Sequence, residues 1–149
     1  MPYRAFVLST RWIDQGAVAA IKLAKTPNRH IAGIIETFLK QHVADKTNWQ
    51  AMLKNEFDDN IDLLAEKNRL AALLNQELKK HLDEDNSITT IEYPGKYSLG
   101  KIQNCSFDKT NLMEGKLIGI KGQYLIFENE TVLNIRKHNG YYINFKLKN

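Results

Sequence analysis

The sequence has 149 residues, the size of one ordinary domain or of two small modules, and its 43% hydrophobic and 26% charged residues exclude a wholly disordered chain. The single cysteine, Cys105, excludes an internal disulfide and a cysteine-rich zinc site. No apolar run approaches the roughly 18 residues of a membrane-spanning helix, and the first residues lack a signal-peptide core. Composition therefore predicts a reduced, soluble, cytoplasmic protein with no membrane partner.

The net charge of +4 is distributed unevenly along the chain. Residues 1–54 hold 8 basic and 3 acidic residues, residues 55–86 hold 4 and 9, and residues 87–149 hold 9 and 5. Two basic segments therefore flank an acidic one. This pattern fits either a helical strut between two mildly basic modules or basic modules that contact a polyanion such as nucleic acid.

The first part of the chain carries mainly helical signals. A short strand is predicted at residues 3–8, followed by a capped short helix at residues 10–16. Residues 17–25 fit either a strand or a helix, because alternation and alanine content compete. The Thr-Pro pair that begins residues 26–43 predicts a capped helix with an apolar face. Residues 49–53 predict another short helix, whose tryptophan we expect to pack against the preceding helix.

Residues 56–82 predict one long amphipathic helix, because leucines recur there at steps of three and four. Beyond residue 86 the period changes to alternation. The sequence therefore divides into a helix-rich part at residues 1–86 and a small β module at residues 87–149, and the predicted fold class is α+β.

The β module is expected to hold several short strands. We predict them at residues 87–93, near 102, and at 116–120, 123–127, 131–136 and 141–147. The last four would form an antiparallel meander with turns at Lys121-Gly122 and Asn139-Gly140, which the strand at 87–93 could close into a small barrel. Alternation directs these side chains to the core: Leu117, Leu125, Phe127, Leu133, Ile135 and either Tyr141 or Tyr142.

Few residues carry a chemical signature. The four histidines are scattered, and nothing near Cys105 would activate its thiol. Glu36 lies off the apolar stripe of its helix, one turn from Lys40, which is typical of a solvated ion pair. Basic and aromatic residues that could hold phosphates and stack bases gather in the β module: Lys116, Lys121, Arg136, Lys137, His138 and Tyr141. The alternative is that these lysines keep the strand edges soluble.

Four long strings resemble an uncharacterised bacterial family, the domain-of-unknown-function family 2797. They are TRWIDQGA at residues 10–17, HVADKTNW at 42–49, GKLIGIKGQYLI at 115–126 and NIRKHNGY at 134–141. The resemblance runs from Thr10 to the end of the chain and implies no established activity.

The central part of that family is in turn similar to a GIY-YIG nuclease module. The similarity implies a strand at residues 17–25, a catalytic arginine at Arg11 and a catalytic, Mg²⁺-binding glutamate at Glu36. Family members usually carry a longer N-terminal part with cysteines and two tyrosine-bearing strands, and residues 1–9 do not resemble it. This departure predicts a truncated product, a remnant or an alternative start, and no nuclease turnover from the chain by itself.

Three hypotheses of function follow. The first is a non-catalytic module that associates with nucleic acid and derives from a GIY-YIG-like scaffold. The second is a Mg²⁺-dependent phosphodiesterase that missing N-terminal elements or another chain would complete. The third is a protein-interaction module, in which the helix at residues 56–82 docks a partner or forms a homo-oligomer.

Overall fold

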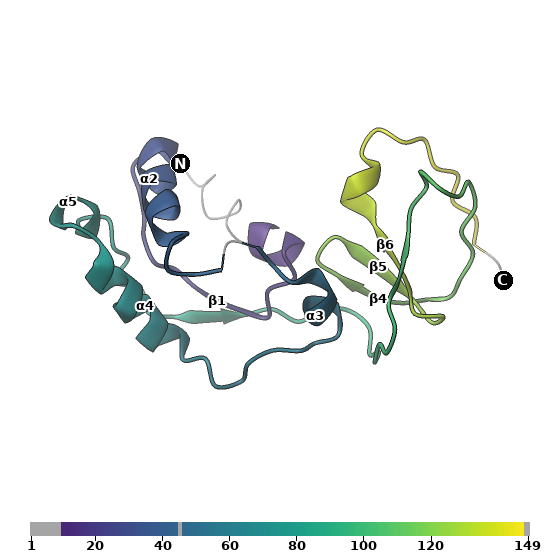
Figure 1. Cartoon of the computed structure of the whole chain (residues 1–149), viewed down its shortest axis with the longest axis horizontal. Helices are drawn as coiled ribbons and strands as arrows, with labels where there is room; N and C mark the ends of the chain where they lie inside the picture. Colours follow the sequence, from purple (N-terminus) through teal and green to yellow (C-terminus); the bar gives the residue numbers. More distant parts are fainter. Residues whose placement is uncertain (1–9, 45, 148–149) are drawn as a thin grey trace.

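Two separate hydrophobic cores organise the fold, and a two-stranded ribbon lies between them (Figure 1). The computed structural model describes residues 10–44 and 46–147. The strand expected at residues 3–8 lies outside the described residues. Helices and sheets are both present, which confirms the α+β class. No helix in the described ranges is long and apolar enough to cross a lipid bilayer.

The first core, called here the helical core, lies among three helices. These are α2 (Arg29–Leu39), α4 (Leu63–Leu73) and α5 (Gln76–Lys79). Its buried side chains are Ile35, Leu39, Leu74 and Leu78, and Ile31, Phe38 and Leu70 pack against them. Helix α2 confirms the helix expected from the apolar stripe, and its Ile31 and Ile35 face this core.

The predicted start and end of that helix are wrong by a few residues. The side-chain oxygen of Asn28 accepts a hydrogen bond from the Ile31 N–H at 3.0 Å, so Asn28 is the N-cap. The Thr26 hydroxyl instead donates to the Asn28 carbonyl at 3.1 Å. Asn and Thr are both good N-cap residues, because the side chain of each can accept from the free N–H groups of the first helical turn. The apolar periodicity therefore does not show whether Thr26 or Asn28 is the N-cap. The helix ends at Leu39 rather than near Val43.

The single long helix expected at residues 56–82 is wrong. The Asp62 carboxylate accepts from two backbone N–H groups at 2.9 and 3.0 Å and begins α4 there. Leu74 is extended, and the Asn75 side chain accepts from the Leu78 N–H at 2.9 Å to begin α5. Asp and Asn compete with the helix for backbone donors, so each starts a new segment. The break directs Leu74 and Leu78 into the helical core.

The second core, the sheet core, is built on a four-stranded sheet. The strands are β3 (Gln103–Cys105), β4 (Leu117–Lys121), β5 (Tyr124–Phe127) and β6 (Thr131–Asn134). Their order is β3-β6-β5-β4, with β3 parallel to β6 and the other pairs antiparallel. The expected β4–β5 hairpin around Lys121-Gly122 is confirmed, and Gly122 adopts a φ of 57° that suits glycine.

Helix α3 (Trp49–Leu53) packs on this sheet. The Trp49 and Tyr124 rings stack with centroids 5.4 Å apart and an interplanar angle of 9°. Leu53 is fully buried with Ile126 and Val132 of the sheet. Trp49 therefore packs as expected against a core, but the expected partner, the helix before it, was wrong. An apolar face in the sequence predicts that a helix is buried, but not which element it packs against.

Two expectations for the sheet are also wrong. Tyr124 and Ile126 face the core in place of Leu125 and Phe127, since this run is apolar on both faces. Of the remaining expected core residues Leu133 is buried, whereas Leu117, Ile135, Tyr141 and Tyr142 are exposed.

The expected strand at residues 141–147 is absent from the described chain. The Asn134 side chain accepts from the Lys137 N–H at 3.3 Å and starts a 3-10 helix, η1 (Ile135–His138), which turns the chain away from the sheet. The strand beside β6 is β3, in the place expected for residues 141–147. The strand expected to close a barrel, β2 (Ile88–Thr90), pairs instead with β1 (Ala19–Ile21). β1 confirms the strand alternative for residues 17–25.

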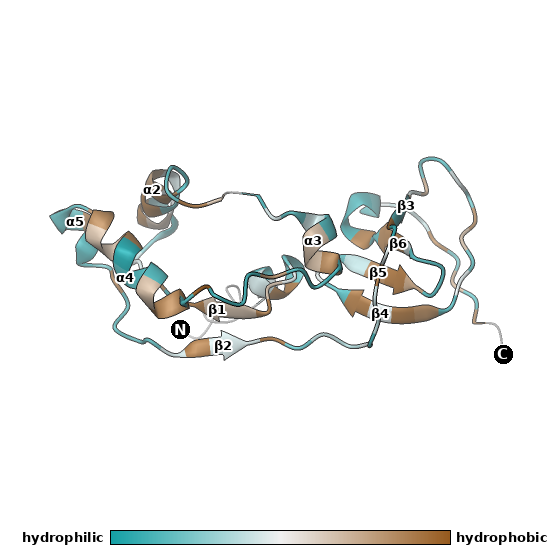
Figure 2. Ribbon diagram, turned by 60° about the horizontal axis from the view of Figure 1, so that its bottom comes forward, coloured by the Kyte–Doolittle hydropathy of each residue, from teal (hydrophilic) through white to brown (hydrophobic). Residues whose placement is uncertain are grey.

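The β1–β2 ribbon runs between the helices and the larger sheet (Figure 2). The chain contributes to the two cores alternately: α2 to the helical core, α3 to the sheet core, α4 and α5 to the helical core, and β4 to β6 to the sheet core. The division of the chain near residue 86 stays a prediction. The sheet core has residues on both sides of it, because α3 precedes residue 86 and packs on the sheet.

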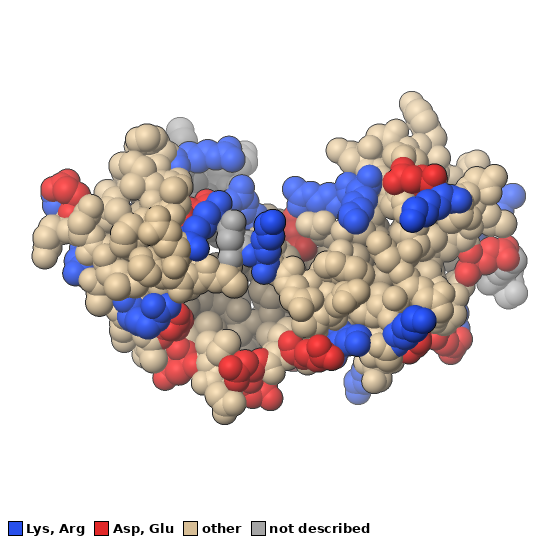
Figure 3. All heavy atoms as spheres, in the orientation of Figure 1, with Lys and Arg blue, Asp and Glu red and all other residues tan. Residues whose placement is uncertain are grey.

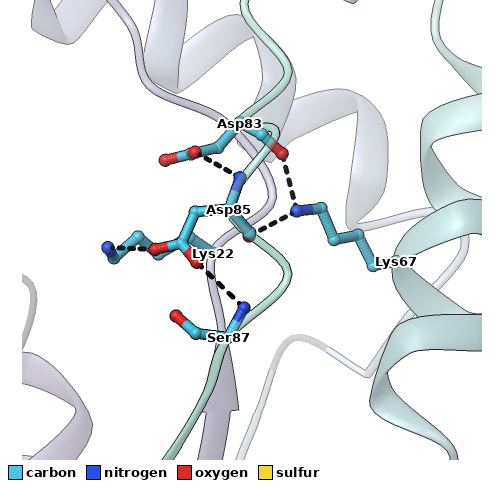
Figure 4. A network of polar contacts seen from close by, with 5 residues as sticks. All are labelled: Lys22, Lys67, Asp83, Asp85 and Ser87. Carbon is cyan, nitrogen blue, oxygen red and sulfur yellow. Dashed lines mark hydrogen bonds and ion pairs between the residues drawn. The ribbon is translucent and has the colours of Figure 1, made fainter.

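A polar network holds the segment that leads into β2 (Figure 4). The ammonium of Lys67, in α4, donates to the carbonyls of Asp83 and Asp85 at 2.6 and 2.8 Å. The Asp85 carboxylate accepts from the Ser87 N–H at 2.9 Å and pairs with Lys22 at 3.0 Å. The buried Lys67 thus has two strong acceptors, and the network joins α4 to the ribbon.

Candidate functional site

The two residues of the GIY-YIG-like prediction, Arg11 and Glu36, lie on different helices. Arg11 is exposed on the helix at residues 10–14. Glu36 lies on the outer side of α2, where its side chain is 65% exposed and its carboxylate is 3.7 Å from the Lys40 ammonium. The expected Glu36–Lys40 pair is therefore confirmed. No hydrogen bond or ion pair joins Arg11 to Glu36 within residues 10–44, and no group of three potential metal ligands occurs in the described chain.

Two basic segments that are distant in sequence do meet. The Arg136 guanidinium of η1 is 3.0 Å from the Asp14 carboxylate of the helix at residues 10–14, across 122 positions of the chain. Arg11 lies three residues before Asp14, so the two Cβ atoms are about 5–6 Å apart on one helix face. Lys137 follows Arg136 and is exposed. Arg11, Arg136 and Lys137, which lie on the two segments that the Asp14–Arg136 pair joins, are called here the junction cluster.

The surface around the two lobes, the part built on the helical core and the part built on the sheet core, is consistent with this grouping. Figure 3 shows Lys and Arg side chains on both sides of the hollow between the lobes. The Arg136 and Asp14 side chains keep 66% and 47% exposure, so the ion pair is open to water and leaves other guanidinium donors available.

Lys116 and Tyr141 have other partners. The Lys116 ammonium pairs with Glu128 at 3.2 Å across the β4–β5 hairpin. The Tyr141 hydroxyl donates to the Asp108 carboxylate. That bond, together with one from Ser106, lowers the pKa of Asp108, and the same carboxylate raises the pKa of Tyr141. Tyr141 therefore contributes to a turn, and its ring remains half exposed.

His138, which was predicted as a nucleic-acid contact, is buried. Its Nδ1 is 2.9 Å from the Asn134 carbonyl, and its Nε2 accepts the Phe107 N–H at 3.0 Å. The Phe107 and Tyr141 rings meet its imidazole edge-on, at 5.2 and 5.3 Å. These contacts assign the proton to Nδ1. His138 clamps the turn that follows β3 and has no surface to offer a polyanion.

Lys121, another predicted nucleic-acid contact, is also buried, with only 1% of its surface exposed. Its ammonium donates to the side-chain oxygen of Asn55 at 2.6 Å. The ammonium also lies 4.4 Å from the centroid of the Phe57 ring and 5.6 Å from that of Tyr93. Burial lowers the pKa of Lys121.

The end of α3 places Asn55 beside this lysine. The Asn55 N–H donates to the Met52 carbonyl at 3.3 Å and the Glu56 N–H to the Ala51 carbonyl at 2.9 Å. This pair of bonds is a Schellman motif, and Asn55 takes its left-handed position with a φ of 58°. Asn adopts this backbone region more readily than most residues do.

A cavity of about 420 Å³ adjoins Lys121 where the ribbon meets the sheet. Its lining includes Asn55, Glu92, Tyr93, Lys96, Tyr97 and Lys121. Burial raises the pKa values of Tyr93 and Tyr97. No sequence pattern indicated Asn55, Glu92, Tyr93, Lys96 or Tyr97 as site residues. The Pro94-Gly95 turn was the available signal of a site at this position, but it indicated only the end of a strand.

Comparisons with known proteins identify one family. The family model described as "Protein of unknown function (DUF2797)" matches residues 4–143. No curated protein and no solved structure matches the chain. The expected family is therefore confirmed, whereas the similarity to a GIY-YIG module stays a prediction.

Proposed function

Because this chain belongs to the DUF2797 family, whose function is unknown, we propose its function from its own residues: it is a non-catalytic module that binds nucleic acid through the junction cluster. Arg11, Arg136 and Lys137 provide the phosphate contacts. Such contacts position a protein on a polyanion and do not select a base sequence. We therefore expect binding to depend on charge and not on sequence.

The Asp14–Arg136 ion pair is the observation that carries this proposal. It joins the helix that carries Arg11 to η1, which carries Arg136 and Lys137, although the paired residues lie 122 positions apart. The two joined segments carry the three cations of the cluster against the one carboxylate of Asp14, which leaves net positive charge there. Arginine can hold the carboxylate with one nitrogen and still donate to a phosphate with others.

The surroundings of Glu36 favour binding over catalysis. A Mg²⁺ site for phosphoryl chemistry usually combines one or two carboxylates with substrate phosphates. Glu36 has the Lys40 ammonium 3.7 Å away, which competes with a metal for the same oxygens. Mg²⁺-dependent cleavage that disappears in Glu36→Ala would instead support the phosphodiesterase hypothesis.

The test is a titration of labelled single- and double-stranded oligonucleotides, followed by fluorescence anisotropy at 50 and 200 mM salt. Arg11→Ala and Lys137→Ala each leave the Asp14–Arg136 pair in place. Each should weaken binding to all sequences alike and reduce the salt slope on duplex DNA by about 0.9 per lost contact. Lys80→Ala is the matched control, because Lys80 is an exposed lysine paired with Glu77 on α5.

Two outcomes would refute the proposal. One is the absence of binding to either oligonucleotide at 50 mM salt. The other is an equal loss of affinity in Lys80→Ala and Lys137→Ala, which would indicate attraction by net charge alone. The protein-interaction hypothesis would then lead, with the exposed side of α4 as its surface.

A further inference from the structure

The last residues of the described chain expose a large apolar surface. Residues 141–147, called here the tail, read Tyr-Tyr-Ile-Asn-Phe-Lys-Leu and form neither a helix nor a strand. Phe145 and Leu147 are 81% and 82% exposed, and Tyr142 is fully exposed. Soluble monomers rarely expose contiguous apolar surface of this kind except at an interaction site. The tail is therefore a candidate binding segment.

The tail has the composition of a β-strand. Aromatic and β-branched residues dominate it, and apolar side chains recur at alternate positions from Tyr141 to Leu147. When such a segment is extended, these alternate side chains form one apolar face. Among residues 10–44 and 46–147, no backbone–backbone hydrogen bond involves residues 142–147. The backbone of the tail is thus available to pair with another strand.

The ribbon offers the edge of a strand. All residues of β2 are exposed, and β2 pairs with β1 along one side. The Ile91 N–H donates to the Val18 carbonyl at 2.9 Å. Because hydrogen-bonded pairs alternate along an antiparallel ladder, the backbone groups of Ile88 and Thr90 point away from β1. Figure 2 shows β2 at the margin of the molecule, with β1 and α4 on its other side.

The tail and this edge complement each other in charge and in apolar pattern. Three consecutive acidic residues, 83–85, precede β2, and Lys146 lies near the end of the tail. An antiparallel pairing brings the end of the tail to the start of β2, so it places Lys146 beside these carboxylates. Ile88 is half exposed and pairs with Ile21 across the ribbon, and the apolar face of the tail would extend this pair.

We propose that the tail of one chain pairs, as a third and antiparallel strand, with β2 of a second copy of this chain. Figure 1 shows the tail on the side of the sheet remote from the ribbon, and the bond from the Tyr141 hydroxyl to Asp108 holds the start of the tail there. Each copy provides one tail and one edge, so a reciprocal exchange closes a two-fold dimer. Main-chain hydrogen bonds provide affinity, and the alternate side chains provide specificity.

This dimer contact is separate from the junction cluster. Arg11, Arg136 and Lys137 lie neither in the tail nor in β2. A chain that dimerises without binding oligonucleotides and a chain that binds them as a monomer are therefore distinguishable outcomes.

The test is sedimentation equilibrium of the whole chain, which measures the dissociation constant of the dimer. We expect a dimer at about 100 µM chain. Phe145→Asp places a charge on the apolar face of the tail and should weaken the dimer at least about 10-fold. Phe145 is exposed in the single chain, so this variant keeps the fold. Leu112→Asp is the matched control, because Leu112 is 66% exposed and lies outside both segments, and it should leave the constant unchanged.

Two further changes test the edge and the orientation of the tail. Thr90→Pro removes an N–H donor from the outer edge of β2 and should also weaken the dimer. Glu84 is exposed before β2, so Glu84→Lys and Lys146→Glu should each weaken the dimer about 3-fold or more, since each dimer holds two such contacts. The double variant should restore the affinity of the unchanged protein.

Three results would overturn the proposal. A monomer at about 100 µM chain would do so and would indicate that a different protein covers the tail. A dimer that Phe145→Asp and Thr90→Pro leave unchanged would place the contact on another surface. A double charge exchange that binds no more tightly than either single variant would exclude the antiparallel pairing.

Discussion

Removal of one hydroxyl group tests how the ribbon is attached to the first helix. Tyr93 follows β2, and its hydroxyl donates to the Ala17 carbonyl at 3.0 Å and approaches the Ile13 carbonyl at 3.2 Å. These carbonyls lie where the helix at residues 10–14 leads toward β1. Tyr93→Phe keeps the ring and removes the donor.

The expected cost comes from the Ala17 carbonyl. The Ile13 carbonyl also accepts the Gly16 N–H at 3.0 Å, whereas Tyr93 is the donor that serves Ala17 in the described structure. Loss of one hydrogen bond costs about 0.5–1.5 kcal/mol, and a partly buried carbonyl left without a donor adds to it. We expect Tyr93→Phe to lower the free energy of unfolding by about 1–2 kcal/mol.

The assay is urea unfolding at pH 7, followed by circular dichroism. Tyr97→Phe is the matched control, because Tyr97 is a half-buried tyrosine of the same cavity whose hydroxyl has no hydrogen bond to any residue in the ranges described. Its substitution should change stability by less than about 0.5 kcal/mol. Equal stabilities of the two variants would refute the assignment of Tyr93 as a donor.

The pH dependence provides a second check. Burial, and then the nearby Asp14 charge, raise the pKa of Tyr93, so the folded protein holds this proton more tightly than the unfolded chain does. The resulting stability is complete below the unfolded pKa of about 10 and is lost as the pH rises through the folded value. The unfolding free energy of the unchanged protein should therefore fall more steeply above pH 10 than that of Tyr93→Phe.

Three further predictions concern other parts of the fold. Trp49→Ala should lower the unfolding free energy by about 2–4 kcal/mol, measured in urea, because it removes a half-buried ring stacked on Tyr124. Glu36→Ala should change it by no more than about 1 kcal/mol, since the side chain is exposed and alanine favours helix; a larger loss would reveal a hidden partner. Ser87 and then Lys22 hold the pKa of Asp85 well below its ordinary value, so the stability advantage over Asp85→Asn, present at pH 7, should shrink as the pH falls below about 4, and a constant difference would contradict this.

The helices and the central hairpin could be predicted from local patterns. The isoleucine stripe of α2 and the Lys121-Gly122 turn each specify one local geometry, and both are observed. The errors arise where a polar side chain competes with such a pattern. Asn75 divides the predicted long helix, and Asn134 begins a 3-10 helix where a strand was expected to continue. Both residues act through single hydrogen bonds that apolar periodicity does not register.

The candidate site was less predictable than the fold. The basic residues of the β module were identified from their types, but whether each is exposed depends on packing from distant segments. Lys121 is covered by Asn55, Phe57 and Tyr93, which lie about 30 to 65 positions away in sequence. Arg11 and Arg136 were predicted on unrelated grounds, and the Asp14–Arg136 pair that joins their segments is a tertiary contact. Sequence patterns provide the residue types at such a site, and the tertiary fold determines their neighbours.

The alternating contribution of the chain to its two cores has a consequence during synthesis. When residues up to 86 have left the ribosome, α2, α4 and α5 can already assemble, but α3 still lacks the sheet on which it packs. Trp49, Met52 and Leu53 must then stay uncovered until β5 and β6 emerge. During translation α3 is therefore exposed between α2 and α4, which are already packed, and its apolar side chains can bind a chaperone. A fragment that stops at residue 86 should aggregate through α3.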